Sequence, residues 1–403
     1  MTAPYVRTLS PFERMWLAAQ ASCGCTLVEG VGNLSASAFR AAVERATEVN
    51  PGSRLQLKGR GPWARWEAVD VAPSITEVDA GDWKARSAEG APYSDIAHMD
   101  PRQTPSTSYV IVQGERPVIV QRTHHATMDG KGAVLFLSDV FRALRGETPL
   151  GAPSTVTDIE LARALGGKKR DLLNTCLNPF ASPSTGLNGS TWRRVTLENV
   201  ALEKVLPRLI LALSRLARRT GRGPVLIDIP VNLRSFFPEV RSTANLTGSV
   251  RLAVPPGATV ESIDADLHAQ IAAHREADAL VSAPDLRFYP LGLLRRVAHS
   301  LERRAVQRNE FSPSAAVSNL GKLNMAEYSG GDFRATSCFI VPPAYDGVPL
   351  FLILSGGANG LDLCARAPVA LASGGRLEGL LAEIGVALGS EVCESADISM
   401  RVE

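Results

Sequence analysis

Apolar and polar positions alternate along this chain in patterns that mix helices with strands over its whole length. In the first half, three- and four-residue spacing of apolar residues predicts helices at about 35–49 and 131–144, and β-branched runs predict strands at 54–58, 63–71, 107–113 and 117–122. In the second half, the same signals predict helices at about 203–219, 262–275 and 376–388, and strands at 191–196, 224–230, 249–254, 315–318, 335–340 and 350–355. Because both halves mix the two kinds of element, the pattern favours an α/β fold built of α+β layers.

The segment after Leu9 leaves two alternatives open. Ser10 suits a helix N-cap, Pro11 suits the first helical position, and Glu13 places an acid in the first turn. The bulky residues 15–17 would also suit a strand. A turn at 345–347, where Tyr-Asp-Gly precedes a strand, is most simply a hairpin turn.

A chain of 403 residues predicts two domains. Turn-forming residues concentrate between about 150 and 190, so we expect an N-terminal subdomain at 1–160, a crossover linker at 161–190 and a C-terminal subdomain at 191–403. No repeat of fixed period is visible.

Charge and composition narrow the function classes. The 43 basic and 41 acidic residues leave a formal charge of only +2, so no overall field favours nucleic acid or an anionic membrane, and a small molecule or a local docking patch fits better. Basic groups at 168–170, 218–219 and 222 could meet coenzyme A phosphates or a carrier protein, although a solvated charged face is the simpler interpretation. We see no secretory signal and no apolar run long enough to span a membrane, so we expect a soluble, cytoplasmic protein.

The six cysteines are scattered, and Cys23-Gly24-Cys25 is their only cluster. Without a second cysteine pair or a nearby histidine, a structural zinc site is not favoured, and reduced buried thiols are expected.

The most informative segment is the loop 124–130, His-His-Ala-Thr-Met-Asp-Gly, which lies between the predicted 107–122 hairpin and the helix at 131–144. Neutral imidazole can take a proton from a hydroxyl or an amine at neutral pH and return it later. One histidine suffices for this, leaving the other histidine and Asp129 to hold the loop, while Gly130 offers a positive φ or a close backbone approach. Two histidines and an aspartate could also bind a metal, but no third histidine lies nearby, so we expect no metal site.

Four motifs in order resemble the chloramphenicol acetyltransferase-like superfamily, which includes condensation domains, polyketide-associated acyltransferases and alcohol acetyltransferases. The loop 124–130 matches its His-His-x-x-x-Asp-Gly signature. The segments 230–234 (Pro-Val-Asn-Leu-Arg), 244–249 (Ala-Asn-Leu-Thr-Gly-Ser) and 317–321 (Val-Ser-Asn-Leu-Gly) are similar to its arginine-bearing strand end, its Gly-Asn segment and the Ser-Asn-Leu-Gly stretch of alcohol acetyltransferases. The chain lacks the Asp-Phe-Gly-Trp-Gly segment of plant members and has Ala244 where many condensation domains carry glycine.

The resemblance implies two similar subdomains in a V with an active-site tunnel between them. It makes His125 the general base, and His124, Asp129 and Gly130 supporting residues. Asp129 would pair with Arg234 across the two halves. For the oxyanion or the tunnel lining, the residues that it suggests are Ser318, Asn319 and Asn245.

For function, the resemblance implies a monomeric enzyme that moves an acyl group from a coenzyme A or carrier-protein thioester to a hydroxyl or amine of a small molecule, such as a secondary metabolite or lipid. It implies no permanently bound cofactor, no covalent intermediate and no nucleic-acid partner. Because no adenylation or carrier domain accompanies the motifs in these 403 residues, we expect a stand-alone acyltransferase. Two alternatives stay open: a condensation enzyme joining carrier-bound substrates, and a catalytically silent scaffold or binding protein.

Overall fold

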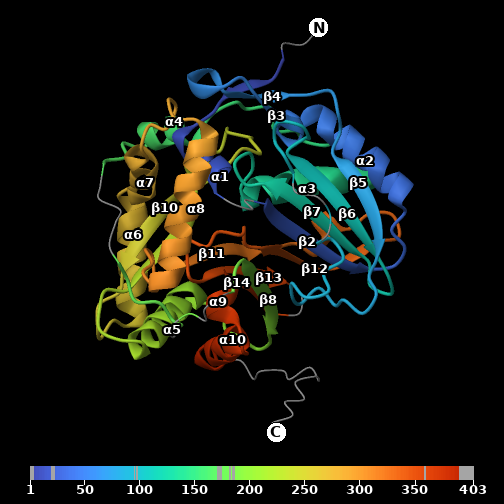
Figure 1. The fold of residues 1–403 in the computed structure, drawn as a ribbon. Coiled ribbons are helices and arrows are strands. Elements are labelled where there is room, and N and C mark those ends of the chain that lie inside the picture. Colours follow the sequence, from blue (N-terminus) through green and yellow to red (C-terminus); the bar gives the residue numbers. More distant parts are fainter. Residues whose placement is uncertain are drawn as a thin grey trace.

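Two large β-sheets with helices packed on them make up most of the molecule (Figure 1). The computed structural model describes residues 4–19, 23–94, 96, 99–169, 175–180, 183, 187–357 and 360–389. Cys393, Arg170 and parts of the expected linker at 161–190 lie outside these residues. The mixed helix and strand composition expected from the sequence is confirmed.

The first sheet has five strands in the order β12-β2-β7-β6-β5. Its strands are β2 (Cys23–Val31), β5 (Ser74–Asp79), β6 (Thr107–Gln113), β7 (Val118–His124) and β12 (Arg334–Val341). The predicted hairpin is present as the antiparallel pair β6 and β7. Every residue of β7 is buried because helices cover one face of the sheet and a loop covers the other.

Two helices cover one face of this sheet, α2 (Ala36–Val49) and α3 (Gly130–Leu144). Both agree with the helices predicted at 35–49 and 131–144. In α3, Phe136, Leu137, Val140 and Phe141 are fully buried, and they face the sheet together with Phe39 of α2. This packing fixes the first turn of α3 against the end of β7, where the histidine loop lies.

The second sheet has six strands in the order β10-β9-β11-β13-β14-β8. Its strands are β8 (Ser190–Leu197), β9 (Leu226–Asn232), β10 (Thr247–Ala253), β11 (Ala315–Lys322), β13 (Phe351–Gly357) and β14 (Gly360–Pro368). The largest apolar core joins this sheet to α5 (Val205–Arg219), α6 (Val260–Ala272), α9 (Val369–Ala372) and α10 (Arg376–Ala387). The helices expected at 203–219, 262–275 and 376–388 are therefore present within a few residues.

A small third sheet, β1-β4-β3, adjoins the first helix. It contains β1 (Val6–Thr8), β3 (Leu55–Lys58) and β4 (Arg65–Ala68), next to α1 (Pro11–Ala18). Ser10 caps α1 with a full capping box, its side chain accepting from the Glu13 amide, so the helical alternative for this segment is correct.

Strand β12 belongs to the second half of the sequence but pairs with β2 in the first sheet. The chain returns to the second sheet at β13, so residues 345–347 connect two sheets and are not a hairpin turn. The hairpin prediction was wrong because β12 and β13, although consecutive in sequence, belong to different sheets. The subdomain boundaries at 160 and 191 stay a prediction. Strand β12 falls within the predicted C-terminal subdomain, although it pairs in the first sheet.

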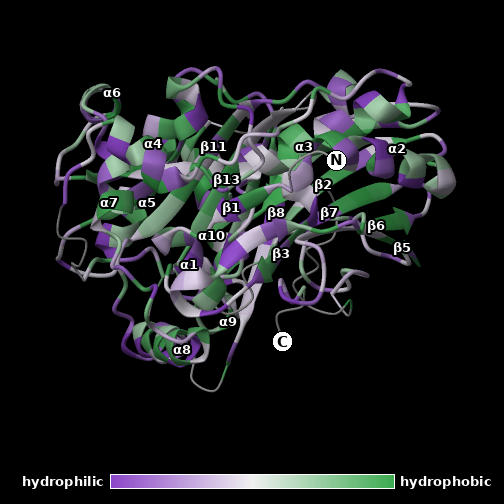
Figure 2. Cartoon of the chain, turned by 90° about the horizontal axis from the view of Figure 1, so that it is seen from above, coloured by the Kyte–Doolittle hydropathy of each residue, from purple (hydrophilic) through white to green (hydrophobic). Residues whose placement is uncertain are grey.

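Helix α9 was not expected from the sequence, and neither were α4 (Asp158–Ala164), α7 (Asp278–Ser282) and α8 (Leu291–Arg308). Helix α8 stands beside α1 in Figure 1 and lies at the outer edge of the molecule in Figure 2, where apolar and polar colours mix along it. Among the described residues, no helix combines the length and apolar character needed to cross a membrane.

Candidate active site

The histidine loop occupies the turn between a buried strand and a buried helix. His124 is the last residue of β7, and Asp129 is the N-cap of α3, its Oδ1 accepting a 2.6 Å hydrogen bond from the amide of Gly132. An aspartate suits this position because its carboxylate satisfies a free amide in the first turn. The loop is thus fixed at both ends.

Asp129 also joins the two halves of the chain. Its Oδ2 accepts hydrogen bonds from Arg234 Nη1 at 2.9 Å, the Leu246 amide at 2.7 Å and Thr247 Oγ1 at 3.0 Å. Burial alone would raise the pKa of this carboxyl, but the charge of Arg234 and these hydrogen bonds outweigh it and lower the pKa below its ordinary value. The expected contact between Asp129 and Arg234 is therefore present as a buried ion pair.

Arg234 and its neighbours bring a segment of the second half against the loop. The guanidinium donates to the carbonyls of Ser242 and Ala244 as well as to Asp129. Gly132 permits this close approach, because a Cβ there would lie 2.2 Å from the carbonyl oxygen of Thr243. The segment 242–247 is consequently held directly over the first turn of α3.

Asn245 lies within that segment and contacts the loop itself. Its Nδ2 donates a 2.8 Å hydrogen bond to the backbone carbonyl of His125. The side chain is buried, and its Oδ1 has no hydrogen-bond partner among the described residues. Asn245 therefore helps to position His125 from the other half of the chain.

His124 faces into the protein. Its Nδ1 accepts a 3.2 Å hydrogen bond from the amide of Ala126, so that nitrogen carries no proton. Burial, followed by the neighbouring His125, lowers the pKa of His124 to about 4. His124 is only 7% exposed, and its contacts shape the turn.

The contacts of His125 define the tautomer of its ring. Its Nδ1 lies 3.2 Å from the carbonyl oxygen of Met128, and a carbonyl can only accept, so Nδ1 carries the proton and Nε2 keeps its lone pair. Burial lowers the pKa of His125 to about 4 against the partial opposition of Asp129, so the ring is neutral at neutral pH. The side chain is only half-buried, which leaves it accessible.

Trp16 of α1 packs against His125, with ring centroids 4.2 Å apart and an edge-on angle of 76°. Tyr345 also packs against Trp16, at 5.8 Å between ring centroids. These residues were not predicted to belong to the site. Their aromatic character was visible, but nothing in the sequence placed them near residue 125.

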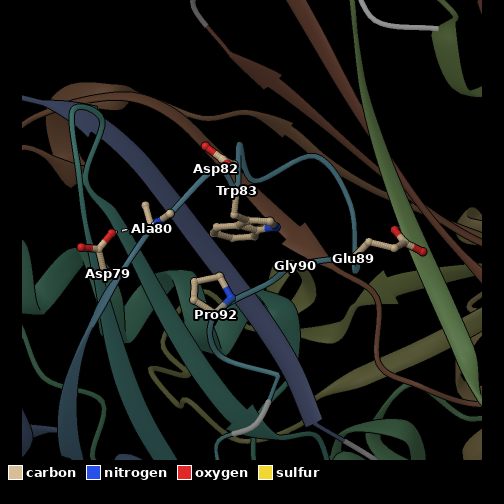
Figure 3. A pocket seen from close by; sticks show the side chains of 8 residues that line it. Asp79, Ala80, Asp82, Trp83, Glu89, Gly90 and Pro92 are labelled. Atoms are coloured by element: carbon tan, nitrogen blue, oxygen red, sulfur yellow. Dashed lines mark hydrogen bonds between the residues drawn. The ribbon is translucent and has the colours of Figure 1, made fainter. Parts of the chain in front are cut away.

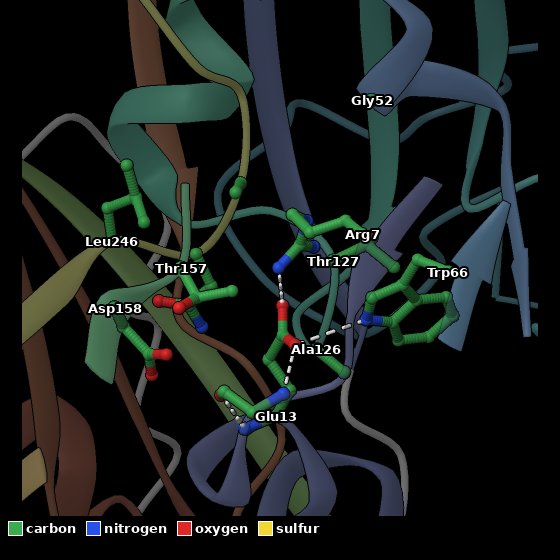
Figure 4. A network of polar contacts seen from close by, with 12 residues as sticks. Arg7, Glu13, Gly52, Trp66, Ala126, Thr127, Thr157, Asp158 and Leu246 are labelled. Carbon is green, nitrogen blue, oxygen red and sulfur yellow. Dashed lines mark hydrogen bonds and ion pairs between the residues drawn. The ribbon is translucent and has the colours of Figure 1, made fainter. Parts of the chain in front are cut away.

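A buried ionic network fixes α1 and therefore Trp16 (Figure 4). Glu13 forms an ion pair with Arg7 and accepts hydrogen bonds from the Ser10 amide at 2.8 Å and from Trp66 Nε1 at 3.2 Å. Asp158 lies near this network, and burial together with the Glu13 charge raises the pKa of Asp158 to about 7. Breaking this network should displace Trp16.

The remaining predicted residues lie on or beside α3 and on β11. Gly130 does not adopt a positive φ, but a Cβ there would lie 3.0 Å from Ile340 Cδ1, which supports the close-approach interpretation. Ser318 is half-buried, whereas Asn319 is exposed and its Oδ1 accepts a 3.0 Å hydrogen bond from the Gly321 amide. No contact among those described joins Ser318 or Asn319 to His125.

Cavities of the described chain lie away from the histidine loop. One of about 610 Å³ lies beside the end of β5 and is lined by Trp83 and Pro92 (Figure 3). The other, of about 780 Å³, lies between the start of α1 and residues 280–287. Neither is lined by His125. Within the described part of the chain, no group of three histidine, cysteine or acidic side chains is arranged to hold a metal ion.

The fold is that of solved condensation domains. The first condensation domain of the calcium-dependent antibiotic synthetase, in complex with a substrate analogue, is 16% identical, with a TM-score of 0.65 over 98% of both chains. The starter condensation domain of rhizomide synthetase in complex with C8-CoA is 16% identical, with a TM-score of 0.62 over 98% of both. The condensation domain from the Monacolin K polyketide synthase is 13% identical, with a TM-score of 0.62 over 95% of this chain and 96% of that one.

No protein-family model matches the sequence, and no curated protein matches it significantly. The fold expected from the four motifs is confirmed by the structural matches. At these identities the matches establish architecture, and the chemistry must be argued from the side chains.

Proposed function

We propose that this protein is an acyltransferase in which His125 acts as general base. The observation that carries the proposal is the tautomer of His125: the Met128 carbonyl holds the proton on Nδ1, and Nε2 is left as a neutral base on a partly exposed residue. Asp129 and His124 are poor candidates for this role. The carboxylate of Asp129 is occupied by four donors, and His124 Nδ1 is occupied by the Ala126 amide.

The reaction follows from that geometry. The acceptor hydroxyl or amine gives its proton to Nε2 of His125 while its oxygen or nitrogen attacks the carbonyl carbon of an acyl thioester. The tetrahedral oxyanion then collapses, the carbon–sulfur bond breaks, and the departing thiolate takes the proton back from the imidazolium. The products are an ester or amide and a free thiol. No group of the protein becomes acylated, so kinetics should be sequential.

Supporting residues in this proposal act by position. Asp129, Arg234 and Asn245 hold the loop so that His125 faces the acceptor. Trp16 excludes water from one side of the imidazole, which keeps it neutral. Ser318 and Asn319 are proposed either to stabilise the oxyanion or to shape the end of β11, and backbone amides near Gly130 are the other candidates for the oxyanion.

Mass spectrometry of reaction mixtures tests the proposal. The protein is incubated with a panel of acyl-coenzyme A thioesters and acceptors, and free thiol and acylated product are measured. We expect His125→Ala to lower turnover by about 100- to 10,000-fold with the fold intact, the range for general acid–base groups. His268→Ala on α6 is the matched control, because that histidine is exposed and remote from the loop, and it should leave turnover unchanged. Near wild-type turnover of His125→Ala would refute the assignment.

A second candidate is a condensation enzyme that joins two carrier-bound substrates. It is favoured by the structural neighbours, whose domains are condensation domains and match this chain over nearly its full length. The two candidates share His125 and differ in the donor. Repeating the assay with acylated carrier proteins separates them: turnover only with carrier-bound acyl groups selects the condensation enzyme. No turnover with either donor would favour a silent scaffold.

A further inference from the structure

Helix α8 is unusually exposed for an 18-residue helix. Glu302 is its only buried residue, and the helix contacts α1 through a 3.1 Å hydrogen bond from Arg295 Nε to the carbonyl of Leu17. Most of its other residues are exposed, while Leu291, Ala305 and Val306 pack against the neighbouring apolar cores. An exposed helix of this kind normally carries polar residues on its outer face.

The outer face of α8 instead carries an apolar stripe. Leu293, Val297 and Leu301 follow one another at four-residue intervals, so they lie on one side of the helix. Their side chains are 47%, 48% and 59% exposed. Single exposed leucines are common on protein surfaces, but three in a row on one helix form a continuous strip that has no partner within the described chain.

Aromatic residues extend the stripe beyond the N-terminal end of the helix. Phe288 and Tyr289 precede α8 and are 73% and 52% exposed. Trp63, which is 78% exposed, lies in the loop whose Gly61 is adjacent to the Arg287 carbonyl. We call these three aromatic residues and the α8 stripe the apolar rim.

Arginines are interspersed with the apolar rim. Arg296, Arg303, Arg304 and Arg308 are exposed on α8, and none has an ion pair or hydrogen bond with a described residue. The only acidic residue of the helix, Glu302, faces inward. The outer face of α8 is therefore strongly basic, although the whole chain carries a formal charge of only +2.

We propose that α8 and the apolar rim form a docking surface for an anionic lipid bilayer. A helix lying in the membrane interface buries apolar and aromatic side chains among the acyl chains and headgroups while its arginines meet lipid phosphates. The apolar rim matches this environment: its leucines and aromatic residues suit the acyl chains, and the unpaired arginines beside it suit the headgroup phosphates. The helix would lie on the bilayer without crossing it.

Two other occupants fit less well. A second copy of this chain would bring the same arginines face to face, and like charges repel at such distances. An acidic carrier protein would match the charge, but aromatic and aliphatic side chains distributed from Trp63 to Leu301 suit an extended apolar layer better than a single groove. Both remain outcomes of the experiment.

Vesicle sedimentation of the full chain tests the proposal. We compare vesicles of phosphatidylcholine with phosphatidylglycerol in about equal parts with vesicles of phosphatidylcholine alone. Wild-type protein should bind the anionic vesicles more tightly, and added salt should weaken that binding. Replacing Arg296 and Arg304 together by glutamine should weaken it by about 25-fold, on the basis of about fivefold for each arginine near an anionic surface.

Two further variants separate charge from apolar contact and from unfolding. Leu293→Ser with Val297→Ser should weaken vesicle binding and change its salt dependence little. The matched control is Arg40→Gln with Arg45→Gln on α2, which removes two exposed helical arginines from another part of the molecule and should bind like wild type. All replaced side chains are exposed, so circular dichroism spectra should be unchanged.

Several results would overturn the proposal. They are the absence of binding to the anionic vesicles, equal weakening by the α2 control, and binding that survives both α8 variants. If vesicles do not bind but an acidic carrier protein does, and the arginine variant abolishes this, the surface belongs to a protein partner. If vesicles do not bind and the serine variant abolishes self-association, a second copy covers the helix.

Discussion

Replacing Asp129 by asparagine should destabilise the protein and affect catalysis only through the position of the loop. The substitution keeps the shape of the side chain but removes its charge, so Arg234 is left buried beside a neutral group. Asparagine can still cap α3 through its oxygen, since it is as good an N-cap as aspartate. Its NH2 group must then face Arg234, the Leu246 amide and Thr247 Oγ1, which formerly donated to the carboxylate.

The size of the effect follows from the buried pair. Asp129 and Arg234 are only 3% and 6% exposed at their side chains, so solvent does little to compensate a lost partner. Removing one member of such a pair costs about 3–5 kcal/mol of unfolding free energy. The retained cap to Gly132 should prevent a further loss of about 1 kcal/mol.

Chemical denaturation followed by tryptophan fluorescence measures the change. Asp139→Asn is a matched control on the same helix: Asp139 is buried and accepts hydrogen bonds from Asn50 Nδ2, the Leu150 amide and the Gly151 amide, each at 2.8 Å, with no cation bonded to it among the described residues. We expect that control to lose about 1–3 kcal/mol and to keep normal turnover per folded molecule.

The reasoning fails if Asp129→Asn is as stable as wild type. The claim that Asp129 affects catalysis only through the position of the loop fails if the variant is stable but loses turnover as completely as His125→Ala. That second result would make the carboxylate a participant in the chemistry.

Three further predictions concern the same loop. Burial lowers the pKa of both His124 and His125 to about 4, so these histidines take up protons in the unfolded chain at a higher pH than in the folded protein. The unfolding free energy should therefore fall as the pH drops from about 6.5 to about 4. Urea denaturation across this range measures the slope, and a flat profile would contradict the burial of the rings. Trp16→Ala should let water reach His125 and move its pKa upward toward 6.5, which a proton NMR titration would detect. Gly132→Ala should cost about 1–3 kcal/mol in denaturation experiments because its Cβ would meet the Thr243 carbonyl, whereas Gly379→Ala in α10, which has open space, should be neutral or stabilising.

Local sequence patterns predicted a helix or strand best where only one face of the element is buried and where a helix begins at a typical N-cap residue. Helix α2 followed from its apolar spacing and from Ser35 as N-cap. Strand β2 was missed because Gly24 and Gly30 interrupt its apolar pattern. The second glycine is required by the fold, since a Cβ there would lie 2.4 Å from the ring of Phe333. Such a requirement depends on a strand some 300 residues away and leaves no local signal.

Helix α8 was missed for a different reason. Pro290 provides no side-chain cap. Leu293, Val297 and Leu301 are exposed beside arginines, and the one buried position is Glu302, so the pattern lacks a continuous apolar face that would identify a packed helix. Overall charge also concealed it, since acidic residues elsewhere cancel its arginines.

The candidate site was predicted in part. The histidines, Asp129 and Asn245 lie in recognisable motifs, and the contact between Asp129 and Arg234 followed from family resemblance alone. Trp16 could not have been placed against His125 from sequence, because their contact depends on how α1 is held by Arg7, Glu13 and the small sheet.

The position of β12 has a consequence for synthesis of the chain. During translation, β2 emerges early, but its neighbour on one side is made only when residues 334–341 leave the ribosome. Until then the first sheet presents an open edge of unpaired backbone groups, which is a template for pairing with other chains. We therefore expect the isolated N-terminal half to aggregate, and expression of the two halves as separate polypeptides to succeed only when they are made together.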